Sequence, residues 1–224
     1  MLNSSLENKT AVVCGSTQGM GKAIAISLAD LGASVILVAR NETKLAMIQE
    51  ELSLPYASQK HEYLCADFSK PDELKEKLAS FLSLKDQIHI LVNNTGGPAP
   101  GLAIDSSVSS FYQAFEQHLV CNQILAQAIV PLMKKVNYGR IVNIISTSVK
   151  QPLAGLGVSN TIRGAVANWS KTLAGELGSF GITVNNVLPG ATETERLAAI
   201  IQNKAKKSGK SIEEVEVLMK SKIP

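Results

Sequence analysis

Residues 9–21 read KTAVVCGSTQGMG, in which a short apolar run leads into a glycine-rich turn and then into a helical pattern. Glycines in such a turn let the backbone approach a pyrophosphate, and the N-terminus of the following helix attracts its negative charge. The spacing is G-x-x-x-G-x-G, which differs from the G-x-G-x-x-G of many dinucleotide-binding proteins. A tight turn that merely packs closely is the alternative, but the strand–turn–helix context favours a dinucleotide site. The predicted cofactor contacts in this stretch are Gly15, Ser16, Thr17, Gln18, Gly19 and Met20.

Strand-like and helical segments alternate along the rest of the chain. Apolar runs of strand length occupy residues 9–14, 34–39, 61–66, 88–92, 140–145 and 182–188. Helical spacing of apolar residues separates these runs, at residues 19–31, 42–52, 71–82, 109–135 and 158–177. Pro131 predicts a kink or break near the end of the fourth of these helices. The alternation predicts a doubly wound α/β domain, the Rossmann fold, with a parallel sheet covered by helices on both faces.

The C-terminal part of the chain has a different pattern. Two polar helices are expected at residues 194–208 and 211–222, and Ser211 with Glu214 predicts a capping box for the second. We therefore expect one dinucleotide-binding domain over residues 1–193 and a helical segment over residues 194–224. No further strand follows the sixth one.

Composition excludes several classes of protein. The 224 residues are 45% hydrophobic with a net charge of +3, which suits a domain with a sizeable core and gives no reason to expect nucleic acid. No apolar run is long enough to span a membrane, and the N-terminus lacks the pattern of a secretory signal. Three scattered cysteines favour buried thiols in a reducing compartment, so a cytoplasmic location is expected. No metal site is predicted.

The end of the second predicted strand indicates which dinucleotide is bound. A site that prefers NAD places a carboxylate there, on the ribose 2′-hydroxyl. Here the strand ends in Arg40 and Asn41, and a guanidinium can pair with a 2′-phosphate. A solvated surface arginine is the alternative. The position favours NADP(H) over NAD(H).

Four further motifs follow strand ends, where open parallel sheets bind ligands. They are Asp67-Phe68, Asn93-Asn94-Thr95-Gly96, the run at residues 139–146 ending in Ser146, and the run at residues 189–194. In order and content they resemble the short-chain dehydrogenase/reductase family, and 3-oxoacyl-(acyl carrier protein) reductases in particular. The resemblance covers residues 9–194. It implies cofactor contacts by Asp67, Phe68, Asn93, Asn94, Gly96, Pro189, Gly190, Thr192 and Thr194.

The catalytic positions depart from the family pattern. The family uses Asn, Ser, Tyr and Lys, and Ser146 matches the serine. Ser159 stands at the Tyr position and Arg163 at the Lys position, while counting back from Pro131 puts His118 at the Asn position. A serine hydroxyl is a far weaker acid than the tyrosine phenol, whose pKa is about 10, and arginine is a poor proton relay because its pKa exceeds about 12.

Three interpretations follow. In the first, which we favour, the protein is a reductase or dehydrogenase whose proton comes from a water or from His118 through Ser159. In the second, it binds NADP(H) without catalysis and acts as a sensor or a partner subunit. In the third, the pocket performs another reaction. An ordinary helix histidine with its hydrogen bonds satisfied is an equal alternative for His118.

The resemblance also implies a substrate, a lid and an assembly. The substrate would be a small carbonyl or alcohol, such as a 3-oxoacyl thioester, in a mostly apolar pocket. Residues 194–222 would form a lid over the nicotinamide. A homodimer or homotetramer is expected, mainly through the helices at residues 109–135 and 158–177. Family members usually continue with a strand and a helix beyond the point that corresponds to Pro224, so either the protein or the given sequence is truncated. If Pro224 is the genuine end, the sixth strand is expected to be an exposed sheet edge.

Overall fold

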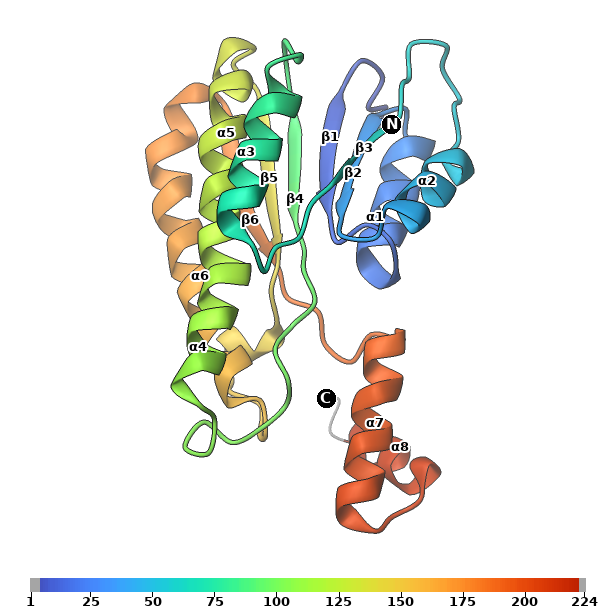
Figure 1. Cartoon of the computed structure of the whole chain (residues 1–224), viewed down its shortest axis with the longest axis vertical. Coiled ribbons are helices and arrows are strands. Elements are labelled where there is room, and N and C mark those ends of the chain that lie inside the picture. Colours follow the sequence, from blue (N-terminus) through green and yellow to red (C-terminus); the bar gives the residue numbers. More distant parts are fainter. Residues whose placement is uncertain (1–4, 222–224) are drawn as a thin grey trace. The chain divides into compact units, whose positions relative to one another are not determined.

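A six-stranded parallel sheet forms the centre of the larger of two compact units in the computed structural model (Figure 1). The structure describes residues 5–221, apart from the side chains of residues 195, 196 and 207. The strand order is β3-β2-β1-β4-β5-β6, with every pair of neighbours parallel, which confirms the doubly wound α/β fold. The strands are β1 (Thr10–Cys14), β2 (Ser34–Ala39), β3 (Glu62–Cys65), β4 (Ile90–Asn93), β5 (Gly139–Ile144) and β6 (Ile182–Val187).

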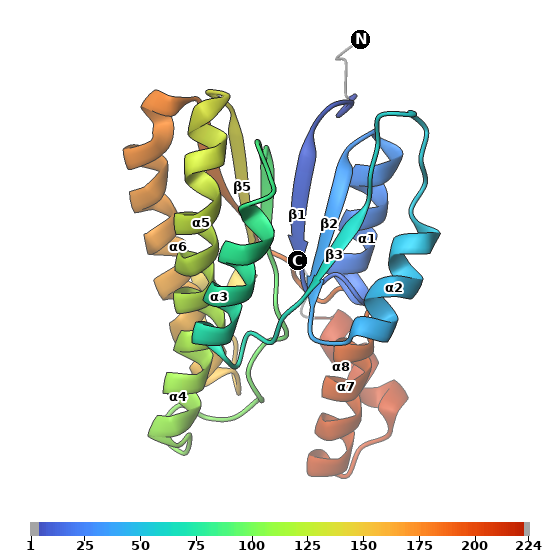
Figure 2. The same cartoon turned by 45° about the horizontal axis from the view of Figure 1, so that its top comes forward.

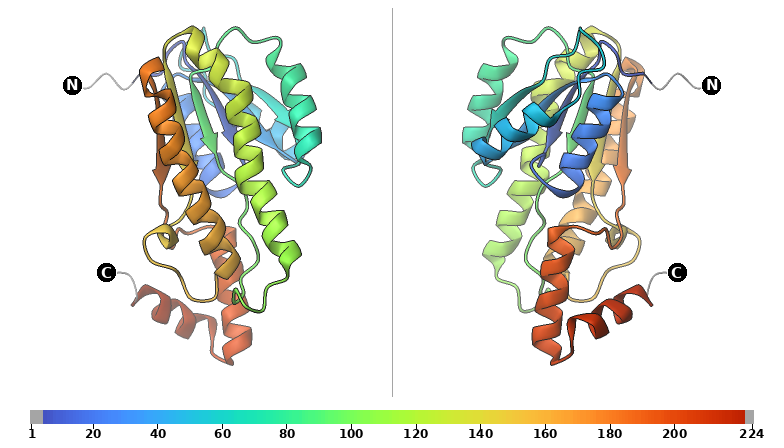
Figure 3. Two further views of the ribbon diagram at one scale, coloured as in Figure 1. Left: turned by 90° about the vertical axis from the view of Figure 1, so that its left-hand side faces the viewer. Right: turned by 90° about the vertical axis from the view of Figure 1, so that its right-hand side faces the viewer.

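Helices cover the two faces of the sheet, as the two side views show (Figure 3). On one face the apolar side of the sheet packs against α3 (Pro71–Leu82), α5 (Cys121–Lys135) and α6 (Gly157–Leu177). On the other face it packs against α1 (Gly19–Asp30) and α2 (Glu42–Glu51), which lie over β1, β2 and β3 (Figure 2). None of the described helices combines the length and apolar character that crossing a membrane requires.

The chain divides into two compact units, the first ending at Leu188 and the second beginning at Pro189. The second unit contains α7 (Glu195–Ser208) and α8 (Ile212–Lys220), which pack on each other through Ile201, Ala205 and Val215. The predicted capping box is present, because the Ser211 side chain accepts from the Glu214 N–H and the Glu214 carboxylate accepts from the Ser211 N–H. Residue 222, the predicted end of that helix, lies outside the described residues. A lid function for this unit stays a prediction.

The helix predicted over residues 109–135 is interrupted, but not at its proline. α4 (Val108–Phe115) passes into a π-helix, η1 (Glu116–Val120), and α5 then continues without a break through Pro131 to Lys135. The helix therefore does not break at Pro131, and a kink there stays a prediction. Proline removes one backbone hydrogen bond, and the buried neighbours Ile129, Leu132 and Met133 hold this turn against the sheet. Short π-helices inside α-helices often mark functional sites.

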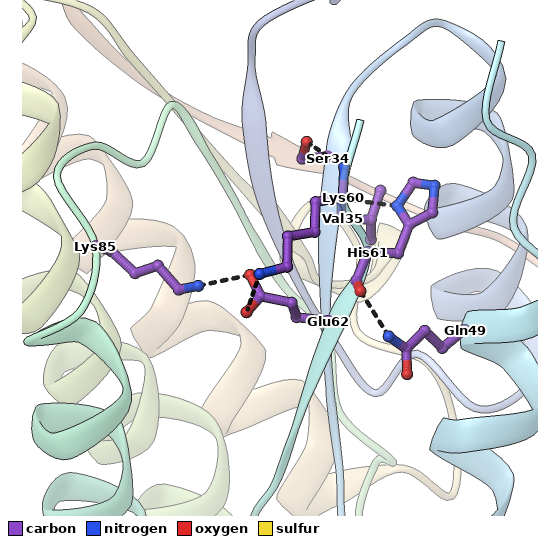
Figure 4. A network of polar contacts seen from close by, with 7 residues as sticks. All are labelled: Ser34, Val35, Gln49, Lys60, His61, Glu62 and Lys85. Carbon is purple, nitrogen blue, oxygen red and sulfur yellow. Dashed lines mark hydrogen bonds and ion pairs between the residues drawn. The ribbon is translucent and has the colours of Figure 1, made fainter. Parts of the chain in front are cut away.

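Two buried histidines serve the fold at the amino-terminal ends of the strands. His61 Nδ1 accepts from the Val35 N–H at 3.1 Å, and His61 Nε2 donates to the Ser53 carbonyl at 3.0 Å. Figure 4 shows the contact between His61 and Val35 together with Gln49, Glu62 and Lys85. His89 plays the same part on β1, where its Nδ1 accepts from the Thr10 N–H at 3.0 Å. Both imidazoles therefore satisfy backbone N–H groups at the amino-terminal ends of the strands, away from the carboxyl ends.

This role leads us to expect that acid destabilises the protein. Burial, with the nearby Lys9 charge, lowers the pKa of His89 in the folded state. The unfolded chain then binds the extra proton more readily, so we expect the free energy of unfolding to fall as the pH drops below about 6.5. Urea unfolding at pH 7.5 and 5.5 measures this fall. His89→Asn keeps an acceptor near Nδ1 without titrating, so its fall should be smaller, and an equal fall would assign the effect to other groups.

Candidate functional site at the strand carboxyl ends

The glycine-rich turn after β1 is shaped so that side chains cannot enter it. Gly15 has φ +60°, and its N–H donates to the Val38 carbonyl at 2.8 Å. A Cβ on Gly15 would lie 2.6 Å from the Asn94 carbonyl oxygen, and a Cβ on Gly21 would lie 2.1 Å from the Gly15 carbonyl oxygen. Both distances are shorter than any normal contact, so the turn requires glycine at these two positions.

Asn94 holds this turn from the neighbouring strand. Its Nδ2 donates to the carbonyl oxygens of Cys14 and Gly15, at 3.2 and 3.3 Å. Asn94 follows β4, which pairs directly with β1. The side chain thus fixes the carboxyl end of β1 and the start of the turn together.

The N-terminus of α1 is suited to an anion. Gln18 is its N-cap residue and makes no side-chain capping hydrogen bond, so the first N–H groups of the helix are not capped by it. The Ser16 hydroxyl is completely buried and has no hydrogen-bond partner within the described part of the chain. A buried polar group without a partner is costly, and a phosphate at the helix N-terminus would offer acceptors there. The residues present therefore fit the pyrophosphate of a dinucleotide.

Charged groups lie at the ends of β2 and β3. Arg40 directly follows β2 and is exposed. The Ser69 N–H donates to Asp67 Oδ1 at 2.9 Å, and this bond, helped by the charges of Arg40 and Lys70, lowers the pKa of Asp67. Phe68 packs partly into the core, and its carbonyl accepts from the Cys121 thiol. A guanidinium and a carboxylate thus stand near each other at the predicted adenosine end of the site.

Ser146 and Arg163 are both positioned at the carboxyl end of β5. Ser146 is half-buried just after this strand, and its Oγ accepts from the Ser148 N–H at 3.1 Å. Arg163, half-buried on α6, donates from Nη1 to the Ile144 carbonyl at 2.9 Å. Ser159 lies one helical turn earlier on α6 and is buried, being 8% exposed. Residues four apart share one face of a helix, so Ser159 and Arg163 lie on the same side of α6.

His118 lies in the π-helix η1, which packs against α6. The imidazole is buried, with 2% exposure, and its Nδ1 lies 2.7 Å from the Thr95 hydroxyl oxygen. Thr95 was absent from the predicted site residues. The signal that could have found it is its place in Asn93-Asn94-Thr95-Gly96, which resembles a family motif that reads Asn-Asn-Ala-Gly.

Asn93 points into a buried chain of amides and hydroxyls. Its Nδ2 donates to Asn143 Oδ1 at 2.7 Å, and Asn143 Nδ2 donates to Ser170 Oγ at 2.8 Å. These contacts tie β4 to β5 and to α6. The Asn93 side chain supports the strand ends, and its contact with a cofactor stays a prediction. Gly96 lies in the exposed loop that follows.

The loops after β4 and β5 are bound to each other. The Gly101 N–H donates to the Gly155 carbonyl at 2.8 Å, and the Gly157 N–H donates to the Gly101 carbonyl at 2.9 Å. Gly157 also contacts Ala103 so closely that a Cβ would lie 2.4 Å from the Ala103 nitrogen. The two loops predicted to line the substrate pocket therefore form one connected wall.

The last predicted contacts belong to the second compact unit. Pro189, Gly190, Thr192 and Thr194 all lie beyond Leu188. The Thr194 hydroxyl caps α7, since its oxygen accepts from the Leu197 N–H at 3.4 Å. Cofactor contacts by these four residues stay predictions. Within the residues that the structure describes, no three His, Cys, Asp or Glu side chains gather as a metal site would require.

Comparison with known proteins gives concordant similarities. A family model described as short chain dehydrogenase matches residues 9–205. The chain is 29% identical over 219 residues to the NADPH-dependent reductase BacG of Bacillus subtilis, covering 98% of this chain and 85% of BacG. It is 30% identical over 195 residues to the 3-oxoacyl-[acyl-carrier-protein] reductase FabG of Aquifex aeolicus, covering 87% and 78%. The crystal structure of L-sorbose reductase from Gluconobacter frateurii, complexed with NADPH and L-sorbose, matches with a TM-score of 0.85 at 27% identity, covering 95% and 81%.

Proposed function

Because the chain belongs to the short-chain dehydrogenase family, we propose that it is an NADP(H)-dependent oxidoreductase that interconverts a carbonyl and an alcohol. The observation that carries the proposal is the glycine cradle at the N-terminus of α1, closed to side chains at Gly15 and Gly21 and held by Asn94. BacG is named an NADPH-dependent reductase, and the L-sorbose reductase structure contains NADPH. Both names agree with the cofactor proposed here.

The residues that would hold the cofactor come from successive strand ends. The turn at residues 15–20 would hold the pyrophosphate, and Arg40 would pair with the 2′-phosphate. Asp67 and Phe68 would contact the adenine, while Asn93, Asn94 and Gly96 would adjoin the ribose and nicotinamide. Bound NADPH supplies a hydride. The preference for NADP(H) over NAD(H) rests on Arg40, which is exposed at the position where an NAD site carries a carboxylate.

Reduction of a carbonyl also needs a proton for the developing alkoxide. In our proposal the Ser146 hydroxyl donates a hydrogen bond to the carbonyl oxygen and polarises it. Ser159 would pass on a proton that His118 or a water supplies, since imidazole titrates near neutral pH. Arg163 would keep a positive charge beside the alkoxide, because its guanidinium is fixed against the Ile144 carbonyl.

One observation favours a second candidate function. Arg163 stands where the family has its lysine and already donates to the backbone, and its high pKa makes it a poor proton relay. A protein with an intact cofactor site and an arginine anchored in this way could bind NADP(H) as a sensor or a partner subunit without turnover. The third candidate is a different reaction in the same pocket.

The finer parts of the proposal concern substrate, lid and assembly. We propose a small carbonyl substrate, such as a 3-oxoacyl thioester or another ketone, held by the joined loops after β4 and β5. Residues 194–222 would act as a lid, and the protein would assemble as a homodimer or homotetramer. Its three cysteines are free thiols, which suits the proposed cytoplasmic location.

Ser146→Ala tests the proposal directly. NADPH binding is titrated by fluorescence, and NADPH oxidation is followed against ketones, aldehydes, quinones and 3-oxoacyl thioesters. The natural sequence should bind and turn over, and the variant should lose about 100- to 1000-fold in kcat, the usual effect of removing a donor to a developing oxyanion. Its affinity for NADPH should stay within a factor of about two, since Ser146 contacts only the substrate in this scheme.

Two further results separate the candidates. Binding without oxidation by any carbonyl would favour the non-catalytic protein. Turnover that survives Ser159→Ala unchanged, while Ser146→Ala abolishes it, would keep the reductase and remove Ser159 from the proton path.

A further inference from the structure

Three consecutive residues at the carboxyl end of β4, residues 93–95, each contact a different part of the site. Asn93 binds Asn143 of β5, Asn94 binds the carbonyls of Cys14 and Gly15, and Thr95 binds His118. The first two contacts hold the sheet and the cofactor turn. The third is the only one of these contacts whose partner is a side chain that can carry a proton near neutral pH.

The contact between Thr95 and His118 is short and shielded. The oxygen-to-nitrogen distance is 2.7 Å, His118 is 2% exposed, and Thr95 is half-buried. Thr95 is anchored by its neighbour Asn94, and His118 is anchored in the π-helix η1 between α4 and α5. The Thr95 hydroxyl is therefore placed to orient the imidazole through its contact with Nδ1.

We propose that Thr95 is a positioning residue for His118. The Thr95 hydroxyl donates to His118 Nδ1 and thereby keeps the imidazole proton on Nε2. A neutral imidazole carries one N–H, and the nitrogen that accepts a hydrogen bond cannot be the one that carries the proton. In the opposite arrangement Nδ1 would donate to the Thr95 oxygen, and Nε2 would have no proton to give. The inference rests on the proposed function, in which His118 supplies a proton toward Ser159 on the adjoining α6.

The tautomer of His118 can be measured without any turnover. The chain has three histidines, so ¹⁵N-histidine labelling and two-bond ¹⁵N–¹H correlation spectra give three imidazole patterns, and His118→Gln identifies the pattern of His118. We expect the Nε2–H pattern for His118 in the natural sequence. Thr95→Val, which keeps the shape without the hydroxyl, should convert it to a mixture of tautomers or to Nδ1–H, and Thr95→Ser should restore it. An Nδ1–H pattern in the natural sequence, or an unchanged pattern in Thr95→Val, would overturn the proposal.

Kinetics then connect the tautomer to catalysis. With a carbonyl that the natural sequence reduces, Thr95→Val should lower kcat at least about tenfold, within the range of general acid–base effects, at an unchanged dissociation constant for NADPH. Thr95→Ser should recover most of the loss. Thr95→Ala serves as a second variant if valine prevents folding. Equal kcat in all variants would overturn the positioning role. A natural sequence that reduces none of the carbonyls would favour the non-catalytic protein instead of the reductase, and the spectra alone would then decide the contact.

Discussion

Gly21→Ala is expected to weaken NADPH binding by about 100-fold, the equivalent of about 2.7 kcal/mol. The added Cβ would lie 2.1 Å from the Gly15 carbonyl oxygen and 2.7 Å from Asn94 Nδ2. Neither neighbour can yield cheaply, because one is backbone in a tight turn and the other is the side chain that clamps this turn. The first turn of α1 must therefore move away from Gly15, and the N–H groups proposed to bind the pyrophosphate move with it. Fluorescence titration with NADPH measures the effect.

The α6 helix supplies a matched control for this change. Gly175 is also a helical glycine, but a Cβ there would meet nothing within 4 Å. Gly175→Ala should therefore raise the free energy of unfolding by up to about 1 kcal/mol, the helix propensity difference between the two residues, and leave NADPH affinity unchanged. Urea unfolding of both variants separates lost folding from lost binding. If Gly21→Ala bound NADPH as tightly as Gly175→Ala, the cradle described here would not be the cofactor site.

The fold could be predicted from the sequence because its signals are local. The strand and helix patterns depend only on residues a few positions apart. Their alternation along the chain left one topology. The capping box at Ser211 and Glu214 is local in the same sense. Pro131 is the counterexample, since the proline signal is local but the packing of Ile129, Leu132 and Met133 against the sheet decides the outcome.

The site was harder to predict because its contacts join distant parts of the chain. Asn94 reaches Gly15 across 79 positions, and Arg163 reaches Ile144 across 19. The sequence pattern could list Asn93 among cofactor contacts, but only the sheet register reveals that Asn143 faces it. Thr194 shows that a sequence motif does not tell which of two partners a side chain has. Its hydroxyl can cap a helix or contact a ligand.

The π-helix around His118 is the clearest example of a feature that the sequence did not predict. A single extra residue in a helical turn leaves no compositional mark, yet it changes which side chains face the site from there on. Thr95 was missed for the same reason, since its meaning depends on a histidine that lies 23 residues later in the chain. Thr95 and His118 each differ from the family pattern. Their importance becomes visible only when the structure shows that they contact each other.

Arg40→Glu is expected to weaken NADPH binding by about 100-fold and to leave NADH binding unchanged or stronger. A hydrogen bond to a charged group contributes about 1.5–3 kcal/mol, which is about 10- to 150-fold in affinity, and the new carboxylate adds repulsion of the 2′-phosphate. NADH lacks that phosphate, so a glutamate at this position could accept from its ribose 2′-hydroxyl. Titration of both nucleotides with the natural sequence and the variant gives the ratio of the two dissociation constants. This ratio cancels any general loss of folding.

Long-range electrostatics could imitate this result, because the change from Arg to Glu alters the net charge by two. Lys60→Glu makes the same change in charge at an exposed lysine just before the start of β3, whereas Arg40 follows the carboxyl end of the neighbouring parallel strand β2. At 0.15 M ionic strength a charge farther away than about 8 Å is largely screened, so Lys60→Glu should leave the NADPH to NADH ratio unaltered. A change of equal size in both variants would mean that Arg40 acts only through the overall field. A change confined to Arg40→Glu would assign the 2′-phosphate to this one side chain.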